Sequence, residues 1–130
     1  MKTLLLTGCF DVLHVGHIRL LQFAKFISDE VIIAIDGDEK VKKDKGSSRP
    51  FNNQQIRQEF LESIKGVDKV YVFFDEEDLE RICKEIRPTY RLVGSDWKDK
   101  KIVGQQYCKE VLYFDRIPGY STTNILEKNL

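Results

Sequence analysis

The feature that most constrains the fold of this chain is the alternation of short apolar runs with longer segments of helical periodicity. Residues 3–7 read TLLLT and residues 31–35 read VIIAI. Short runs of this kind, without regular polar alternation, are typical of strands buried on both faces of a sheet. Between them, residues 16–27 carry apolar side chains at helical spacing, with polar side chains in between. We interpret this segment as a helix with one broad apolar face: Ile18, Leu21, Phe23, Ala24, Phe26 and Ile27.

The same alternation continues to the end of the chain. Strands are predicted over 69–74, 90–93 and 111–114. Helices are predicted from Asn52 or Asn53 to about 65, over 76–86, and from Ser121 or Thr122 to about 128. In the helix that starts near Asn53 we expect four apolar side chains to point inward: Ile56, Phe60, Leu61 and Ile64. Strands and helices in this order predict an α/β fold with a doubly wound, largely parallel five-stranded sheet and helices on both faces.

Composition excludes several classes of protein. A chain of 130 residues has room for one domain, which we assign to residues 1–130. Lys plus Arg number 21, as do Asp plus Glu, and a net charge of zero argues against sequence-independent nucleic-acid binding. The longest apolar run, residues 31–35, is far shorter than the roughly 20 residues that span a bilayer. No signal peptide is read either. We therefore expect a soluble cytoplasmic protein without a nucleic-acid or membrane partner.

The cysteines fit the same compartment. There are three, at positions 9, 83 and 108, and none forms a C-x-x-C pair. An odd number without that spacing predicts free thiols and no disulfide framework or zinc site.

Polar segments follow the predicted strands. In doubly wound sheets, ligands bind at the carboxyl ends of the strands, where the strand order reverses. The segments that leave the strands span residues 8–16, 36–50, 94–101 and 115–123. Residues 36–50 are polar and contain a lysine cluster (Lys40, Lys42, Lys43 and Lys45), which predicts a flexible loop or a solvated surface.

The two histidines of the chain, His14 and His17, lie three residues apart at the first of these strand ends, with Gly16 between them. Neither a dinucleotide-binding glycine motif nor a Walker phosphate loop is present in the sequence. His17 falls in the first turn of a predicted helix, where backbone N–H groups and the helix dipole favour an anion. The pair could therefore donate hydrogen bonds to phosphate oxygens. The alternative is that one histidine caps the helix and the other packs against it.

Two motifs resemble those of one enzyme superfamily. Residues 8–11 (GCFD) followed by His14-x-Gly16-His17 resemble the signature of the cytidylyltransferase-like nucleotidyltransferases. Near the C-terminus, Gly119-x-Ser121-Thr122-Thr123 resembles their second signature. The resemblance implies a Rossmann-like fold that transfers a nucleotidyl group from a nucleoside triphosphate to a phosphorylated small molecule and releases pyrophosphate. It also implies a homodimer and Mg²⁺ bound with the triphosphate.

The resemblance assigns roles to individual residues. His14, His17, Lys45 and Arg116 become the catalytic candidates, which contact the phosphates during transfer. Asp11 is the candidate Mg²⁺ ligand, unless it only orders its turn. Trp97 borders the nucleotide, unless it packs on the edge of the sheet. The expected nucleotide-binding residues are Gly8, Cys9, Phe10, Asp11, Gly16, Arg57, Gly94, Asp96, Trp97, Ser121, Thr122 and Thr123. Cys9 is assigned no nucleophilic role, and Ser121 and Thr122 could simply cap a helix.

Two branches of the superfamily compete. Lys45-Gly46-x-x-Arg49-Pro50, Arg57 and residues 94–97 (GSDW) resemble the heptose 1-phosphate adenylyltransferases, which favours ATP and a sugar phosphate. The length and Arg116-x-x-Gly119 instead resemble the glycerol 3-phosphate cytidylyltransferases, which use CTP. Ser95 and the pair Asp36-Gly37 depart from the usual pattern. Outside enzymes, a nucleotide-binding module without turnover is the alternative. A flavodoxin-like electron carrier would leave both signatures unexplained.

Overall fold

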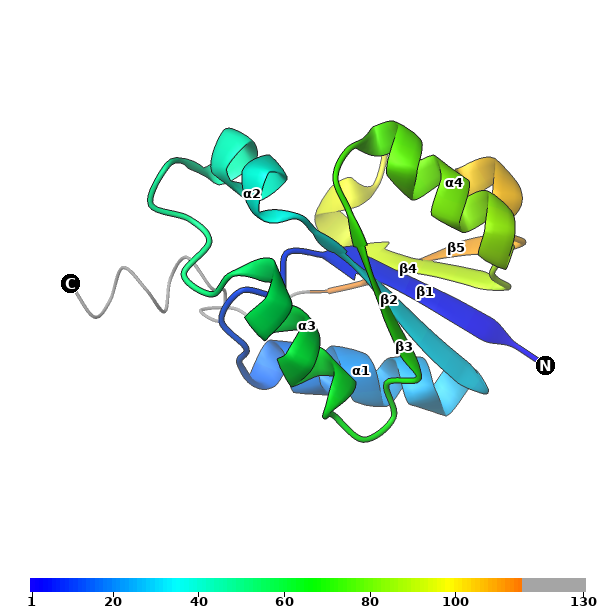
Figure 1. Cartoon of the computed structure of the whole chain (residues 1–130). Coiled ribbons are helices and arrows are strands. Elements are labelled where there is room, and N and C mark those ends of the chain that lie inside the picture. The colour runs from blue at the N-terminus through cyan, green and yellow to red at the C-terminus, as the bar shows by residue number, and fades with distance from the viewer. Residues whose placement is uncertain (116–130) are drawn as a thin grey trace.

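A computed structural model describes residues 1–115 and contains a five-stranded sheet flanked by helices (Figure 1). The strands are β1 (Thr3–Gly8), β2 (Glu30–Asp36), β3 (Lys69–Phe73), β4 (Tyr90–Gly94) and β5 (Glu110–Phe114). The helices are α1 (Val15–Ile27), α2 (Asp38–Lys45), α3 (Gln54–Glu62) and α4 (Glu76–Ile86). Two single turns of 3₁₀ helix, Ser95–Trp97 and Gln105–Tyr107, lie between β4 and β5.

The strands lie in the order β3-β2-β1-β4-β5, and every neighbouring pair is parallel. The chain builds the sheet outward from β1 to β3, and then returns to place β4 on the other side of β1. The strand order therefore reverses between β1 and β4, where the loops that follow the two strands leave in opposite directions. This arrangement confirms the predicted doubly wound α/β fold.

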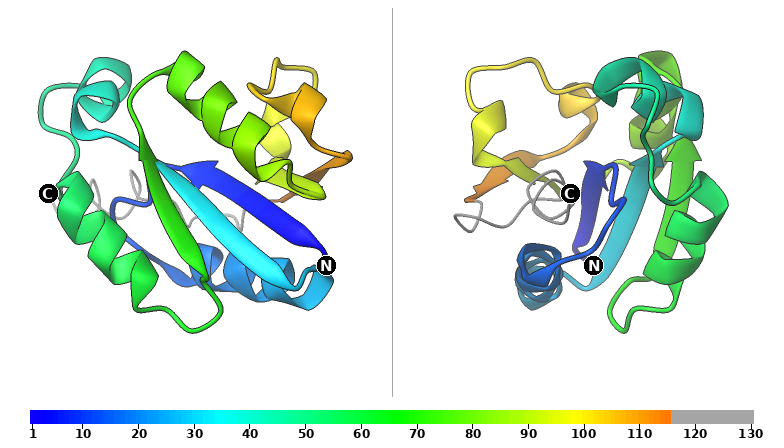
Figure 2. Two further views of the ribbon diagram at one scale, coloured as in Figure 1. Left: turned by 45° about the vertical axis from the view of Figure 1, so that its right-hand side comes forward. Right: turned by 90° about the vertical axis from the view of Figure 1, so that its left-hand side faces the viewer.

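Each face of the sheet has its own apolar core. Leu21 and Ala24 of α1 and Leu61 of α3 pack with Leu4 and Leu6 on one face. On the other face, Leu79, Ile82 and Cys83 of α4 pack with Leu5 and Ala34. Figure 2 shows α1 and α3 on one side of the strands and α4 on the other. Consecutive residues of β1 thus serve opposite cores, which is why this strand is apolar throughout.

The buried apolar face of α1 is narrower than the sequence predicts. Phe26 is 88% exposed and Ile18 is 42% exposed, whereas Ala24 is completely buried. Phe26 lies about 160° around the helix from Ala24, because successive residues turn by roughly 100°. The prediction that both side chains belong to the buried face was wrong.

Residues 36–50 are not the wholly irregular loop that their composition indicates, since residues 38–45 form helix α2. Asp38 and Glu39 lie in its first turn and Lys42, Lys43 and Lys45 in its last, an arrangement that the helix dipole favours. Its single buried side chain is Val41. One apolar residue in eight gives no periodic pattern, which explains why the helix was missed.

Helix α3 begins as predicted, because the side chain of Asn53 accepts a hydrogen bond from the Ile56 N–H. Of the side chains expected to point inward, Leu61 is buried, whereas Phe60 is 55% exposed. Ile56 is also partly exposed. The helix predicted to start at Ser121 or Thr122 lies outside the described residues. Within residues 1–115, no helix has the length and apolar character needed to cross a membrane.

Candidate active site

A cavity of about 710 Å³ opens at the carboxyl ends of β1 and β4, at the point where the strand order reverses. This size suits a small-molecule ligand. Most of the predicted site residues lie in its wall. Those that do are Gly8, Cys9, Phe10, Asp11, His14, Gly16, His17, Lys45, Gly94, Asp96 and Trp97.

The two histidine side chains together cap the N-terminus of α1. His14 is the N-cap, and its Nδ1 accepts a hydrogen bond from the Gly16 N–H at 3.0 Å. The Nδ1 of His17 accepts one from the His14 N–H at 3.1 Å. A Cβ on Gly16 would lie 2.7 Å from the His14 ring, so only glycine leaves room for this capping arrangement. The predicted alternative, a capping histidine, is thus realised by both rings.

The capping contacts use Nδ1 of each ring and not Nε2. Because Nδ1 accepts a hydrogen bond in each ring, the proton of the neutral imidazole must be on Nε2. Burial lowers the pKa of His17 to about 4, and the nearby charges of His14 and Lys45 act in the same direction. His17 is therefore neutral at physiological pH. It presents a fixed N–H donor to the cavity and carries no charge of its own.

Asp11 holds the loop that follows α2 against the end of β1. Its carboxylate accepts hydrogen bonds from the backbone N–H groups of Phe51 and Asn52, both at 2.7 Å. The Arg49 Nε lies 3.3 Å from the same carboxylate, whose side chain is fully buried. Both carboxylate oxygens are occupied in this way. The geometry therefore favours the view that Asp11 orders its turn over the alternative that it binds Mg²⁺.

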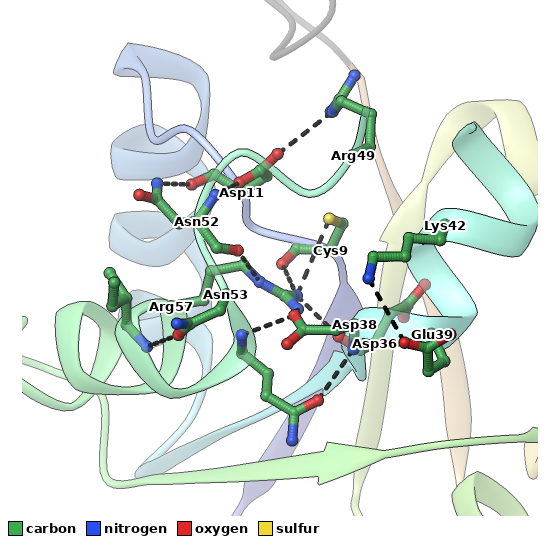
Figure 3. A network of polar contacts seen from close by, with 12 residues as sticks. Cys9, Asp11, Asp36, Asp38, Glu39, Lys42, Arg49, Asn52, Asn53 and Arg57 are labelled. Carbon is green, nitrogen blue, oxygen red and sulfur yellow. Dashed lines mark hydrogen bonds and ion pairs between the residues drawn. The ribbon is translucent and has the colours of Figure 1, made fainter. Parts of the chain in front are cut away.

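Arg57 is the one predicted nucleotide-binding residue of the described chain that does not line the cavity. It is 1% exposed and lies behind the cavity wall. Its Nη1 donates to the carbonyl oxygens of Cys9 at 2.9 Å and Asp36 at 2.7 Å. Its Nε donates to the carbonyl of Asn52, and its Nη2 contacts the Asp38 carboxylate at 2.8 Å. Figure 3 shows the guanidinium at the centre of these contacts.

These contacts give Arg57 a structural task. They join the segment after β1, the segment after β2 and the start of α3 through one planar group with five donors. The side chain that the sequence assigns to the nucleotide instead positions the backbone around the nucleotide candidates.

Helix α2 brings its lysines to different places. Lys40 lies 3.5 Å from Asp36 and 2.8 Å from Asp44. Burial opposes its charge, but Asp44 and Asp36 outweigh that effect and raise its pKa. Lys45, at the end of α2, lies in the cavity wall and its charge reaches His17 and Cys9. Of the lysine cluster, Lys40 and Lys45 face the cavity, whereas Lys42 pairs with Glu39 on the surface.

The segment after β4 forms the opposite wall. Residues 95–97 make a turn of 3₁₀ helix, and a Cβ on Gly94 would lie 2.6 Å from the Asp96 carboxylate. Trp97 is 46% exposed and lines the cavity. The Nζ of Lys100 lies 5.8 Å from its ring.

Burial raises the pKa of the Cys9 thiol, an effect that outweighs the nearby cations. A protonated thiol is a poor nucleophile, so the surroundings of Cys9 do not favour covalent chemistry there.

Some site residues were missed by the sequence analysis, and others lie beyond residues 1–115. Arg116, Ser121, Thr122 and Thr123 belong to the second group. The sequence analysis missed Arg91, which lines the cavity from the middle of β4. The sequence could have pointed to it, because an arginine inside a strand that is predicted to be buried is unusual. Further wall residues that were not singled out are Thr7, Phe73, Glu76, Leu79, Lys101 and Asp115.

The described residues do not form a ready-made metal site. Residues 1–115 contain no group of three or more His, Cys, Asp or Glu side chains placed to hold a metal ion. Both carboxylate oxygens of Asp11, the predicted Mg²⁺ ligand, accept hydrogen bonds from backbone N–H groups of the loop.

Comparison with known proteins places the chain among related sequences. The model of the family described as cytidylyltransferase-like matches residues 5–128. The bifunctional protein HldE of Campylobacter fetus is 42% identical over 128 residues, which cover 98% of this chain and 28% of HldE. HldE of Nitratiruptor is 41% identical over 121 residues, 93% of this chain and 26% of that protein. The chain thus spans about a quarter of the length of these relatives.

Solved structures agree on the fold. The lipopolysaccharide core biosynthesis protein of Thermoplasma volcanium superposes with a TM-score of 0.70 at 22% identity, covering 93% of this chain and 99% of that one. Pantoate-beta-alanine ligase of Francisella tularensis gives 0.62 at 17% identity over 99% of this chain and 66% of its own. At such low identity, these likenesses support the architecture alone.

Replacement of Arg57 tests the structural task given to it. Arg57→Leu removes the guanidinium that donates to three carbonyl oxygens and pairs with the Asp38 carboxylate, so we expect a loss of about 3–5 kcal/mol in the free energy of unfolding. Urea denaturation measures it. The matched control is Arg81→Leu on the surface of α4, which should unfold close to wild type. A similar result for Arg57→Leu would contradict the structural role.

The pKa of His17 predicts a pH dependence of stability. The unfolded chain titrates this histidine near 6.5 and the folded chain near 4. Between these values the unfolded state binds more protons than the folded state. The contribution of His17 to the free energy of unfolding is therefore complete above pH 6.5 and is lost as the pH falls toward 4. We expect a loss of about 2 kcal/mol between pH 7 and pH 5.

His17→Gln isolates this effect, since glutamine at this helix position can also accept the hydrogen bond from the N-cap N–H but does not titrate. Urea denaturation of both proteins at pH 7 and pH 5 should show a smaller loss for the variant. Equal losses would mean that His17 titrates normally in the folded protein.

Proposed function

This chain belongs to the cytidylyltransferase-like family, and we propose that it is a nucleotidyltransferase that acts on a small sugar or polyol phosphate. A nucleoside triphosphate, ATP in preference to CTP, donates the nucleotidyl group, and pyrophosphate is released. The observation that carries the proposal is the pair of capping histidines at the N-terminus of α1. They face a cavity with Nδ1 occupied and Nε2 carrying the proton.

The triphosphate lies against this helix end. The backbone N–H groups of the first turn, the helix dipole and the two Nε2 donors all favour negative charge at that place. Lys45 supplies a cation from the end of α2, and its charge reaches His17. Arg116, with Ser121, Thr122 and Thr123, completes the phosphate contacts in this proposal. The nucleoside lies toward Gly94, Asp96 and Trp97, which form the wall on the β4 side.

The transfer is a direct displacement. An oxygen of the acceptor phosphate attacks the α-phosphorus, and the bond from that phosphorus to the bridging oxygen of pyrophosphate breaks. Pyrophosphate leaves with the electron pair. A phosphate nucleophile is already ionised at neutral pH, so the step needs no general base. Positioning and donors around the developing charge are what such a transfer requires. The neutral His17 suits that task, because it donates without having to lose or gain a proton.

The choice of ATP rests on the loop motifs. Lys45-Gly46-x-x-Arg49-Pro50 and residues 94–97 resemble the heptose 1-phosphate adenylyltransferases, which supports ATP and a sugar phosphate. Within this motif, Arg49 contacts Asp11 and so helps to hold the loop at the end of β1.

Mg²⁺ belongs to the proposal as a companion of the triphosphate. It would be held mainly by phosphate oxygens and would offset their charge, since Mg²⁺ usually keeps few protein ligands at such sites. We also propose that residues 1–130 act as a single nucleotidyltransferase domain, that the protein forms a homodimer and that it works in the cytoplasm.

The first test is a matrix of substrates. Purified protein with Mg²⁺ is incubated with ATP, CTP, GTP or UTP, each combined with a panel of sugar 1-phosphates and with glycerol 3-phosphate, and pyrophosphate release is measured. We expect release with ATP and a sugar 1-phosphate. A site that reads one base edge should reject another base by much more than a single methylene contact provides. If CTP with glycerol 3-phosphate were the best pair, the chain would instead be a glycerol 3-phosphate cytidylyltransferase.

The second test separates the cap from the chemistry. Asparagine is a favoured N-cap residue, so His14→Asn keeps an acceptor for the Gly16 N–H while it removes the Nε2 donor. We expect a normal melting temperature and a fall in kcat of about 10²- to 10³-fold, as is typical for loss of one preorganised donor. If His14→Asn retains the wild-type rate, His14 only caps the helix.

A further inference from the structure

A buried arginine lies in the middle of the sheet. Arg91 of β4 is 2% exposed and pairs in register with Leu5 of β1 and Val111 of β5. Its guanidinium points to the α4 face, where it reaches the Val103 carbonyl and lies beside the Cys83 thiol. Neither the proposed phosphate contacts at α1 nor the fold requires a charge there.

The charge of Arg91 has no acidic partner within residues 1–115. Its Nη1 donates to the Thr7 hydroxyl at 2.9 Å and its Nη2 lies 3.5 Å from the Val103 carbonyl, both of which are neutral groups. Burial raises the pKa of the Cys83 thiol, so that group is protonated and supplies no compensating charge. The Nε of Arg91 is buried without any hydrogen-bond partner among the described residues. Burial of an uncompensated guanidinium opposes folding, unless an anion joins it.

Arg91 also lines the cavity, from the side opposite the histidines. Thr7 and Arg91 belong to the wall on the α4 face, together with Leu79 of α4. His17 and Leu20 belong to the wall on the α1 face. The cavity therefore spans the ends of β1 and β4 and has one set of phosphate-compatible donors on each side of the sheet.

We propose that Arg91, oriented by the Thr7 hydroxyl, binds the phosphate group of the acceptor on the α4 side of the cavity. The inference rests on the proposed function. An in-line displacement needs the attacking oxygen on the side of the α-phosphorus opposite the leaving pyrophosphate. With the triphosphate at α1, the acceptor phosphate then lies on the side that carries Arg91. A guanidinium offers two parallel donors to a phosphate, which sets both the position and the orientation of the nucleophile.

Kinetics separate this role from a merely structural one. Arg91→Met keeps the length and apolar stem of the side chain but removes the charge and the donors. We expect the KM for the sugar 1-phosphate to rise by about 10- to 100-fold, a range typical of hydrogen bonds to a charged group, while the KM for ATP changes by less than about threefold. Arg81→Met, the same change on the exposed face of α4, should leave both constants unchanged. Equal loss toward both substrates, or no change in the acceptor KM, overturns the proposal.

Thr7 serves as a positioning residue and has its own matched pair. Thr7→Ser keeps the hydroxyl that accepts from Arg91, and Thr7→Val removes it with little change in shape. The acceptor KM should stay near wild type in the first variant and rise several-fold in the second. The same KM in both variants overturns the positioning role.

A binding measurement keeps the inference separate from the proposed function. The protein is saturated with α,β-methylene-ATP, which occupies the nucleotide side and cannot be cleaved, and its melting temperature is followed as inorganic phosphate is added. Phosphate should raise the melting temperature of the wild type and of Arg81→Met but not that of Arg91→Met. This result can be obtained even if no substrate pair releases pyrophosphate, in which case the proposed function alone fails. An equal phosphate effect in Arg91→Met overturns the subsite.

Discussion

The arrangement of the site depends on one buried guanidinium. Arg57 donates to backbone carbonyls of the segments after β1 and β2 and to the start of its own helix, and it pairs with Asp38. The loops at the carboxyl ends of the strands have few apolar contacts to hold them. Charge-assisted hydrogen bonds hold these loops together instead. Asp11 adds a second anchor, because its carboxylate fixes the loop at Phe51 and Asn52. These two residues tie the loops of the cavity wall together.

On this frame, the histidines can serve structure and chemistry together. Each ring uses Nδ1 to close the start of α1 and thereby places its remaining proton on Nε2. Burial and nearby cations keep His17 neutral. In the proposed reaction, such a pair stabilises phosphate charge as a donor and not as an acid. The proposed nucleophile, an ionised phosphate, requires no base, so the chemistry and the protonation state agree.

The sequence predicted the parts of this molecule that local patterns determine. Strands β1 and β2 follow from unbroken apolar runs, and the site loop follows from the paired histidines after Gly8. Helix α2 could not be seen, because Val41 is its one buried side chain. Arg57 was assigned to the nucleotide through the family resemblance, whereas its partners in the structure include backbone carbonyls far away in the chain. Such long-range contacts have no sequence pattern. Arg91 could have been noticed as a charge inside an apolar strand, but the lack of a partner for its Nε within residues 1–115 is visible only in three dimensions.

The central claim is that transfer occurs directly between two anions held on opposite sides of the strand ends, without a covalent intermediate on the protein. Exchange of radiolabelled pyrophosphate into ATP tests it most directly. We predict that label enters ATP only when the nucleotide-linked sugar is present, because only that product can return the nucleotidyl group to pyrophosphate. Exchange with ATP alone would contradict direct transfer, since it requires a nucleotidyl group held covalently by the enzyme.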